Sequence, residues 1–324
     1  MITPLDYSDF LKQEYLREYI PQGGAAVKFV VPSDGARIAD VFGPVRMGAQ
    51  AAGFDVAAVD ADRVKIHMIH EVFHAIAKQI DWDALAQKVS RDVLEGIGFR
   101  VPAAPDAFDL ETLARANDYM PNVLNVDFSK ALQQRIIKDF AMAQEFRHAM
   151  FALCRAAVDP SGATQTTRAA VLEWLRGELR RVSAVKYALI YQRIGRHNAR
   201  HMLFSLAHWL TTVGRTGLVL TIGMGQLAKA KRDEAGDGLY YTKAAVLDAY
   251  EALRQLIDGT DELRSCLVLV GCAPEFLTDP ARGLEAYHAL HLRIADEVRD
   301  RHRANPFAAL VRLTSGLPRI ESAP

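Results

Sequence analysis

Short apolar segments separated by helix-like stretches are the feature that most restricts the fold of this chain. Two of them, at 27–31 (VKFVV) and 54–59 (FDVAAV), flank a helical pattern at 36–52 that Gly53 ends. Short buried strands joined through a helix favour a parallel sheet that is covered on both faces. Three later segments have the same apolar character: 217–222, 266–270 and, more weakly, 308–313. We therefore expect an α/β protein with a mostly parallel sheet of about five strands.

A long block of helical pattern separates the second strand from the third. It runs over 66–210, which is too long for a simple crossover between parallel strands. We expect this block to be a helical insertion that packs on a core made of 27–65 and 211–324. The residues before the first strand, 1–26, are expected to form an N-terminal helical segment, with an amphipathic helix near 8–19.

Composition excludes several classes of protein. The formal net charge is zero, so no global positive field attracts nucleic acid or an anionic membrane. The three cysteines, Cys154, Cys266 and Cys272, form no CxxC pair, which argues against a zinc knuckle or a disulfide framework. The charged N-terminus does not resemble a signal peptide, and no apolar run approaches the length of a membrane-spanning helix. The expectation is a cytoplasmic protein without a membrane segment.

Several segments carry a family likeness in a fixed order. They lie at 10–31, 53–81, 197–220, 249–259 and 266–294 and together cover most of the chain. In these segments the sequence resembles the AAA+-like ATP-binding proteins of BREX-type phage-defence and related bacterial conflict systems. The resemblance implies a P-loop NTPase-like core.

A P-loop has strict chemical requirements, which the family motif GxxxxGK[ST] meets. Its glycines let backbone amides close around phosphates, its lysine reaches the β- and γ-phosphate oxygens, and its hydroxyl holds magnesium. The matching segment here is PSDGARIA. Its one glycine, Gly35, stands at a variable position of the motif and not at either of the two glycine positions. Pro32 and Arg37 replace the two glycines, and Ile38 and Ala39 replace the lysine and the hydroxyl residue. Four such changes together predict the loss of ordinary MgATP binding.

The resemblance also implies an acidic pair at the end of the strand at 217–222, which would position magnesium and activate water. Gly223 and Met224 stand there instead, and neither can bind a metal or accept a proton. Ala273 occupies the place of a polar sensor residue. Residues 314–324 are too few for the helical lid of related proteins, so we expect no C-terminal lid.

These losses predict a catalytically inactive, ATPase-like subunit with no catalytic residues and no cofactor. Such a chain would act as a scaffold or regulator, in a homo-oligomer or with an intact paralogous ATPase or helicase, and DNA is a further possible partner. In the family-like stretch at 282–293, Arg282 and Arg293 are candidates to reach a neighbouring subunit's nucleotide. The alternative for each is a structural ion pair.

A basic stretch is a second candidate contact surface. Arg193, Arg196 and Arg200 follow one another at helical spacing, with Tyr187 and Tyr191 nearby. This pattern suits a partner protein or nucleic acid. The alternative is an ordinary solvated helix surface.

One motif favours a different chemistry. Residues 70–74 read HEVFH, which on a helix places His70 and His74 on one face and puts Glu71 beside them as a general base. The pattern is that of a zinc-dependent hydrolase. No third histidine follows at the expected spacing, although a later acid such as Glu95 could serve. Zinc is therefore an alternative, and no metal is favoured.

Overall fold

The computed structural model describes residues 2–33, 35–102, 108–229, 238–295 and 305–315. The chain divides into two compact units. The first contains Met1–Ile76 and Gly214–Pro324, and the second contains Ala77–Val213. The second unit begins eleven residues after the start predicted for the insertion at 66–210 and ends three residues after its predicted end, because most of the helix that begins at Ile69 belongs to the first unit.

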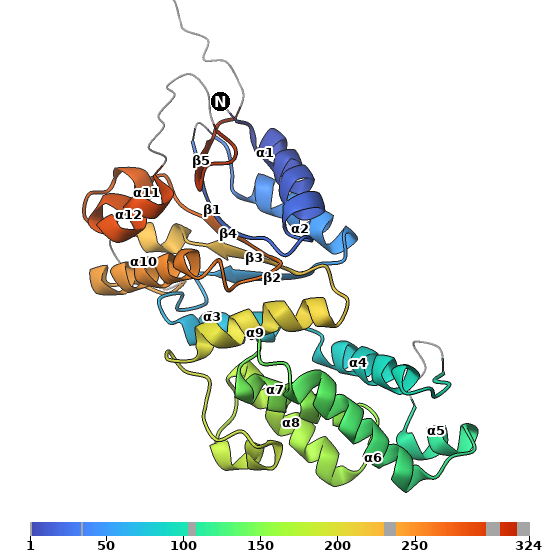
Figure 1. Cartoon of the computed structure of the whole chain (residues 1–324). Coiled ribbons are helices and arrows are strands. Elements are labelled where there is room, and N and C mark those ends of the chain that lie inside the picture. The colour runs from blue at the N-terminus through green and yellow to red at the C-terminus, as the bar shows by residue number, and fades with distance from the viewer. Residues whose placement is uncertain (1, 34, 103–107, 230–237, 296–304, 316–324) are drawn as a thin grey trace, which may run out of the picture. The chain divides into compact units, whose positions relative to one another are not determined.

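The first unit is built on a five-stranded parallel sheet, which confirms the predicted α/β fold (Figure 1). The strand order is β2-β3-β4-β1-β5, and every neighbouring pair is parallel. The strands are β1 (Ala25–Pro32), β2 (Asp55–Asp60), β3 (Leu218–Gly223), β4 (Cys266–Gly271) and β5 (Leu310–Leu313). All five apolar segments are thus strands.

Helices of the first unit cover both faces of this sheet, with α1 and α2 on one side and α10 and α12 on the other (Figure 1). The helical elements are α1 (Pro4–Phe10), the π-helical η1 (Leu11–Tyr19), α2 (Ala39–Ala51), α3 (Ile69–Ala77), η4 (Gly225–Ala228), α10 (Lys243–Asp258), α11 (Glu275–Thr278), η5 (Leu284–Ala286) and α12 (His288–Ile294). Residues 284–294 form the short 3-10 turn η5 followed by α12, and 296–304 lie outside the described residues.

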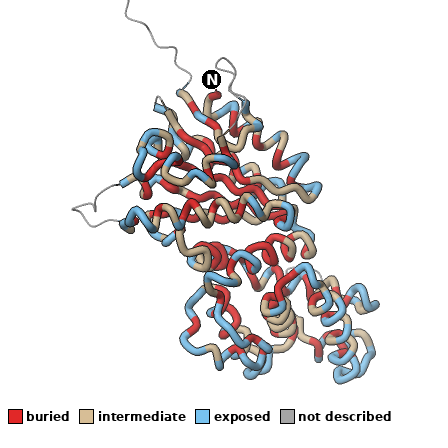
Figure 2. Tube along the Cα trace, turned by 60° about the vertical axis from the view of Figure 1, so that its left-hand side comes forward, coloured by how far each residue is buried: buried red, intermediate tan, exposed pale blue. Residues whose placement is uncertain are grey.

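Successive side chains of β1 point to opposite faces of the sheet and pack into two separate apolar layers. Val30 joins α1, η1 and α2 in one buried cluster, whereas Phe29 stacks on Phe276 on the opposite face at a centroid distance of 6.1 Å. Tyr250 of α10 meets the same Phe276 ring edge-on at 5.6 Å. The central strands are buried on both faces, as Figure 2 shows, which is the usual state of a parallel sheet.

The second unit is helical throughout its described residues. Its elements are α4 (Trp82–Gly96), α5 (Leu110–Ala116), α6 (Pro121–Leu132), the π-helical η2 (Gln133–Ile137), α7 (Gln144–Ala156), α8 (Gly162–Arg176), the 3-10 helix η3 (Val182–Ala188) and α9 (Ala199–Thr212). Trp82 and Phe146 pack edge-on at 6.3 Å in its core. No helix in the described part of the chain has both the length and the apolar character needed to cross a membrane.

Strand register places one row of residues across the carboxyl end of the sheet. Asp60 of β2 lies level with Gly223 of β3, which lies level with Gly271 of β4 and, through it, with Val30 of β1. In open parallel sheets, ligands bind outside the carboxyl ends of the strands, where the chain connections change direction. This row therefore marks the edge at which a ligand site is expected.

Candidate functional site

The segments predicted to form a nucleotide pocket do meet at this edge. Backbone hydrogen bonds join the strand ends: Cys272 N–H donates to the Val30 carbonyl at 2.9 Å, and Met224 N–H donates to the Gly271 carbonyl at 2.7 Å. The loop after β1 and the Gly223-Met224 pair therefore belong to one site. Its chemistry depends on what these segments place there.

The loop after β1 directs its first polar groups toward β5. Ser33 donates both its N–H and its hydroxyl to the Leu313 carbonyl, at 2.8 and 2.7 Å. Pro32 has no N–H to offer. Gly35 has a φ of +80°, a left-handed conformation that glycine adopts without a Cβ clash. The loop thus satisfies its Ser33 donors within the fold and does not keep them free for a phosphate.

The carboxylate of Asp40 lies at the start of helix α2. Asp40 is in the first turn of that helix, where negative charge is favoured by the helix dipole. Arg37 pairs with Asp40, with Nη2 and Oδ1 2.8 Å apart, and the pairing raises the pKa of the exposed guanidinium. The position that would receive a phosphate in a P-loop protein therefore already carries an ion pair.

Ile38, the residue predicted to stand in place of a P-loop lysine, packs into the apolar layer. It is half-buried against the cluster formed by α1, α2 and the sheet. A Cβ built on Gly271 would lie only 2.6 Å from Ile38 Cγ2 and 3.0 Å from Phe42 Cζ. The Ile38 side chain therefore occupies the space directly over the end of β4.

Gly223, which lies beside Gly271 in the sheet, is covered in the same way by the side chain of Asp60. A Cβ on Gly223 would lie 2.5 Å from Asp60 Oδ2, so the Asp60 carboxylate lies over the end of β3. Burial is the main cause that raises the pKa of Asp60, opposed by the hydrogen bond that Asp62 N–H donates to Asp60 Oδ1 at 3.2 Å. Sequence reasoning missed this residue, whose one signal was its position as the last residue of a strand.

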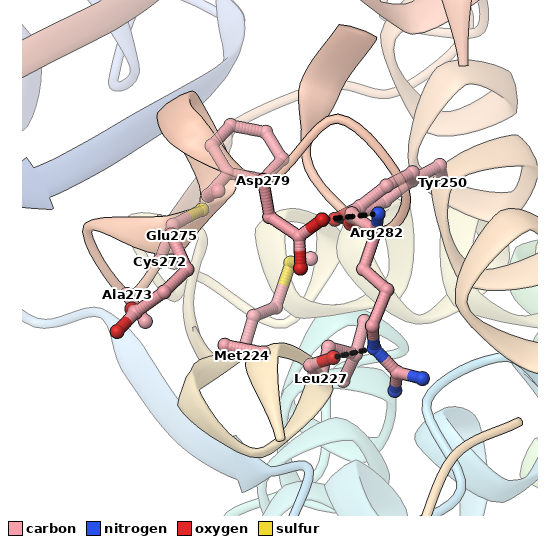
Figure 3. Close-up of a pocket in the computed structure, with 10 residues that line it drawn as sticks. Met224, Leu227, Tyr250, Cys272, Ala273, Glu275, Asp279 and Arg282 are labelled. Atoms are coloured by element: carbon pink, nitrogen blue, oxygen red, sulfur yellow. Dashed lines mark hydrogen bonds between the residues drawn. The ribbon is translucent and has the colours of Figure 1, made fainter. Parts of the chain in front are cut away.

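Met224 lines a small buried pocket together with Tyr250, Cys272 and Arg282 (Figure 3). Its free volume is about 10 Å³. A single water molecule needs about that much space. No nucleotide fits there. Burial raises the pKa of the Cys272 thiol, which keeps it in the unreactive neutral form.

Arg282 is a structural residue of this pocket. It is 9% exposed, and its guanidinium donates to the carbonyls of Leu227 and Tyr241 at 3.1 and 2.8 Å. Its backbone N–H donates to Asp279 Oδ1 at 3.1 Å, as Figure 3 shows. A side chain held in this way is not placed to reach another subunit, so the interpretation as a contact to a neighbour's nucleotide is not supported.

The other arginine candidates lie at the surface. Arg293 Nε pairs with Asp258 Oδ1 at 2.7 Å, which corresponds to the structural alternative. In the second unit, Arg193 donates to the Arg180 carbonyl, and Arg196 and Arg200 are exposed. Arg193 and Arg196 lie in the segment before α9 (Ala199–Thr212) and Arg200 lies on that helix, so the helical spacing expected for the three is wrong, and their use as a contact surface stays a prediction.

The HEVFH motif does form the start of a helix, α3, with two imidazoles close together. The His70 and His74 ring centroids are 6.2 Å apart. Glu71 Oε1 is 3.8 Å from His70 Nε2. The residues that the structure describes contain no group of three or more His, Cys, Asp or Glu side chains able to hold a metal ion. Glu95, the acid considered as a third ligand, does not join these histidines in such a group.

Comparison with known proteins gives one match. The family model described as BREX system ATP-binding protein BrxC/D matches residues 16–317. No curated protein and no solved structure matches the chain. The parallel five-stranded sheet agrees with the P-loop-like fold that the resemblance implied. Because the match spans nearly the whole sequence, the chain belongs to the BREX system ATP-binding protein BrxC/D family.

Proposed function

We propose that this chain is a non-catalytic subunit of a phage-defence complex and that it acts by binding other proteins. The observation that carries the proposal is the position of Ile38 over Gly271. An apolar side chain fills the place from which the P-loop lysine reaches the phosphates.

Charge at this edge supports the proposal independently. Asp40 and Asp60 both place carboxylates near the strand ends, and the one cation of the loop, Arg37, pairs with Asp40. A nucleoside triphosphate brings several negative charges, which need uncommitted cations or bound magnesium to offset them. Asp62 is a carboxylate neighbour of Asp60, and residues 224–229, which directly follow β3, supply no acid that could complete a magnesium site.

Family membership supports a complex with other proteins, and the partners named here are part of the proposal. An intact paralogous ATPase or helicase of the same cytoplasmic system, or further copies of this chain, would supply the catalytic activity that this pocket lacks. DNA contact, where it occurs, would use the surface of Arg193, Arg196 and Arg200, which the fold leaves exposed.

Titration of labelled ATP with magnesium tests the proposal. We expect no saturable binding below millimolar ATP and no turnover by the purified chain. Micromolar binding of ATP together with its turnover by the chain would contradict the proposal.

Asp60→Asn serves as the diagnostic variant in this experiment. If the wild-type chain turns ATP over and the variant does not, Asp60 has replaced the missing acid and the subunit is catalytic. Asp9→Asn is the matched control, because Asp9 is an exposed acid of α1 that pairs with Lys12 at 2.6 Å. A contaminating ATPase would be equally active in all three preparations.

A further inference from the structure

We propose that the second unit carries a docking groove for an acidic, amphipathic helix of a partner protein. The groove lies between α7, α8, η2 and η3 and has a free volume of about 970 Å³. The proposal rests on the proposed function in one respect, since it names the kind of partner that a binding subunit would take.

The lining of the groove is apolar. Phe151 and several alanines, including Ala152, Ala184 and Ala188, form much of its surface. The threonines of α8 present their methyl groups, because Thr166 and Thr167 donate their hydroxyls to carbonyls of their own helix, at 2.8 and 3.1 Å. Small residues and methyl groups let another helix approach closely.

One wall of the groove presents two exposed apolar side chains. Tyr187 is 91% exposed and Leu189 is 51% exposed. Leu189 also has a φ of +57°, which is unfavourable for a residue with a branched side chain. Backbone strain at an exposed apolar residue points to a function in binding. Tyrosine is also common among the residues that dominate protein interfaces.

Charge identifies the occupant. The four elements that border the groove, η2, α7, α8 and η3, contain six Lys or Arg residues and two acids, Glu145 and Glu173, and neither acid is in the lining. Two of these cations already pair with acids of α4: Arg135 with Asp92 and Arg168 with Asp83. The remaining cations, with Arg155 in the lining itself, favour a helix that carries Asp or Glu beside its apolar face.

Single-stranded nucleic acid is the competing occupant, because exposed tyrosines and cations can also stack bases and bind phosphates. The apolar lining favours the peptide. Threonine hydroxyls that are bonded within the helix cannot donate to phosphate oxygens.

A display library of helical 14-residue peptides, selected against the full chain, tests the groove. We expect enriched peptides with apolar residues at i, i+3 or i+4 and i+7 and with flanking acids. Ala184→Glu, which adds a carboxylate to the lining, should weaken their binding at least tenfold by fluorescence anisotropy. Ala169→Glu is the matched control, since Ala169 is an exposed residue of α8 outside the groove.

A second variant separates binding from folding. Leu189→Gly removes the exposed side chain and suits the positive φ, so it should weaken binding severalfold without lowering the melting temperature. The proposal is overturned if no peptide family is enriched or if enriched peptides bind Ala184→Glu as well as the wild type. Binding of a dT15 oligonucleotide that Ala184→Glu abolishes, without peptide competition, would also overturn it. None of these results depends on ATP binding or turnover, which test the proposed function separately.

Discussion

The Ile38 side chain lies over Gly271, with Ile38 Cγ2 only 2.6 Å from where a Cβ of that residue would be. Ile38 directly precedes helix α2 as its N-cap residue, and Gly271 ends strand β4, so the contact joins two elements that are far apart in the sequence. A similar relationship joins Asp60 and Gly223 one strand away. At both positions a neighbouring side chain uses the room that a glycine leaves.

The first prediction concerns the Ile38–Gly271 contact. Gly271→Ala should lower the free energy of unfolding by about 1–3 kcal/mol, because the added methyl overlaps Ile38 and Phe42. Ile38→Ala in the same chain should relieve part of that cost, so the double variant is more stable than the sum of the two single changes predicts. Denaturant unfolding measures all three. Gly162→Ala is the control, since a Cβ there meets nothing within 4 Å. Additive effects would contradict the contact.

The second prediction is a pH dependence at Asp60. Burial raises the pKa of Asp60 in the folded state, so the folded chain holds this proton more tightly than the unfolded chain does. The resulting stability is complete below the unfolded pKa and is lost as pH rises through the folded pKa. Asp60→Asn should therefore increase stability relative to the wild type more at pH 7 than at pH 4.

Unfolding titrations at both pH values check this prediction. Asp9→Asn, at an exposed acid of α1, should show no such difference between the two values. An equal effect of Asp60→Asn at pH 4 and pH 7 would mean that the folded environment does not favour the protonated acid.

The third prediction separates the two arginine candidates. Arg282→Gln should cost about 2 kcal/mol of stability, because it leaves the buried carbonyls of Leu227 and Tyr241 without their charged donor. Arg293→Gln should cost less than about 1 kcal/mol, because its ion pair with Asp258 is exposed to solvent. Thermal and denaturant unfolding compare them. Equal costs would show that burial does not distinguish the two residues.

The fourth prediction concerns the HEVFH helix. Protein purified without an affinity tag should contain well under one zinc per chain, because His70 and His74 gain no third ligand among the residues that the structure describes. Elemental analysis measures the metal. Stoichiometric zinc that His70→Ala removes, and that His201→Ala leaves in place, would restore the metallohydrolase interpretation.

Sequence reasoning located the strands because their signal is local. Short apolar runs such as 266–270 can only be buried, and β4 is buried along its whole length. Helix boundaries were less predictable. The expected helix at 36–52 begins at Ala39, because Ser33 and Gly35 form a turn first. The apolar run at 27–31 also contains a cation, Lys28, that is buried in the fold. Lys28 donates to the Phe307 and Ala308 carbonyls at 2.5 and 3.0 Å, which satisfies two of its hydrogen-bond donors, while burial lowers its pKa to about 8.

The candidate site also has features that the sequence predicts and features that depend on the fold. Which residues occupy positions 38, 223 and 224 is a matter of residue identity, so the sequence by itself determined that Ile38, Gly223 and Met224 stand where the resemblance implies a lysine and two acids. The loss of P-loop chemistry is the prediction that follows from these identities. Which side chains surround these positions was decided by tertiary structure. Strand order and register bring Asp60 beside Gly223, and helix packing brings Ile38 over Gly271. These contacts join residues distant in sequence, and local propensity carries no information about which distant strands become neighbours.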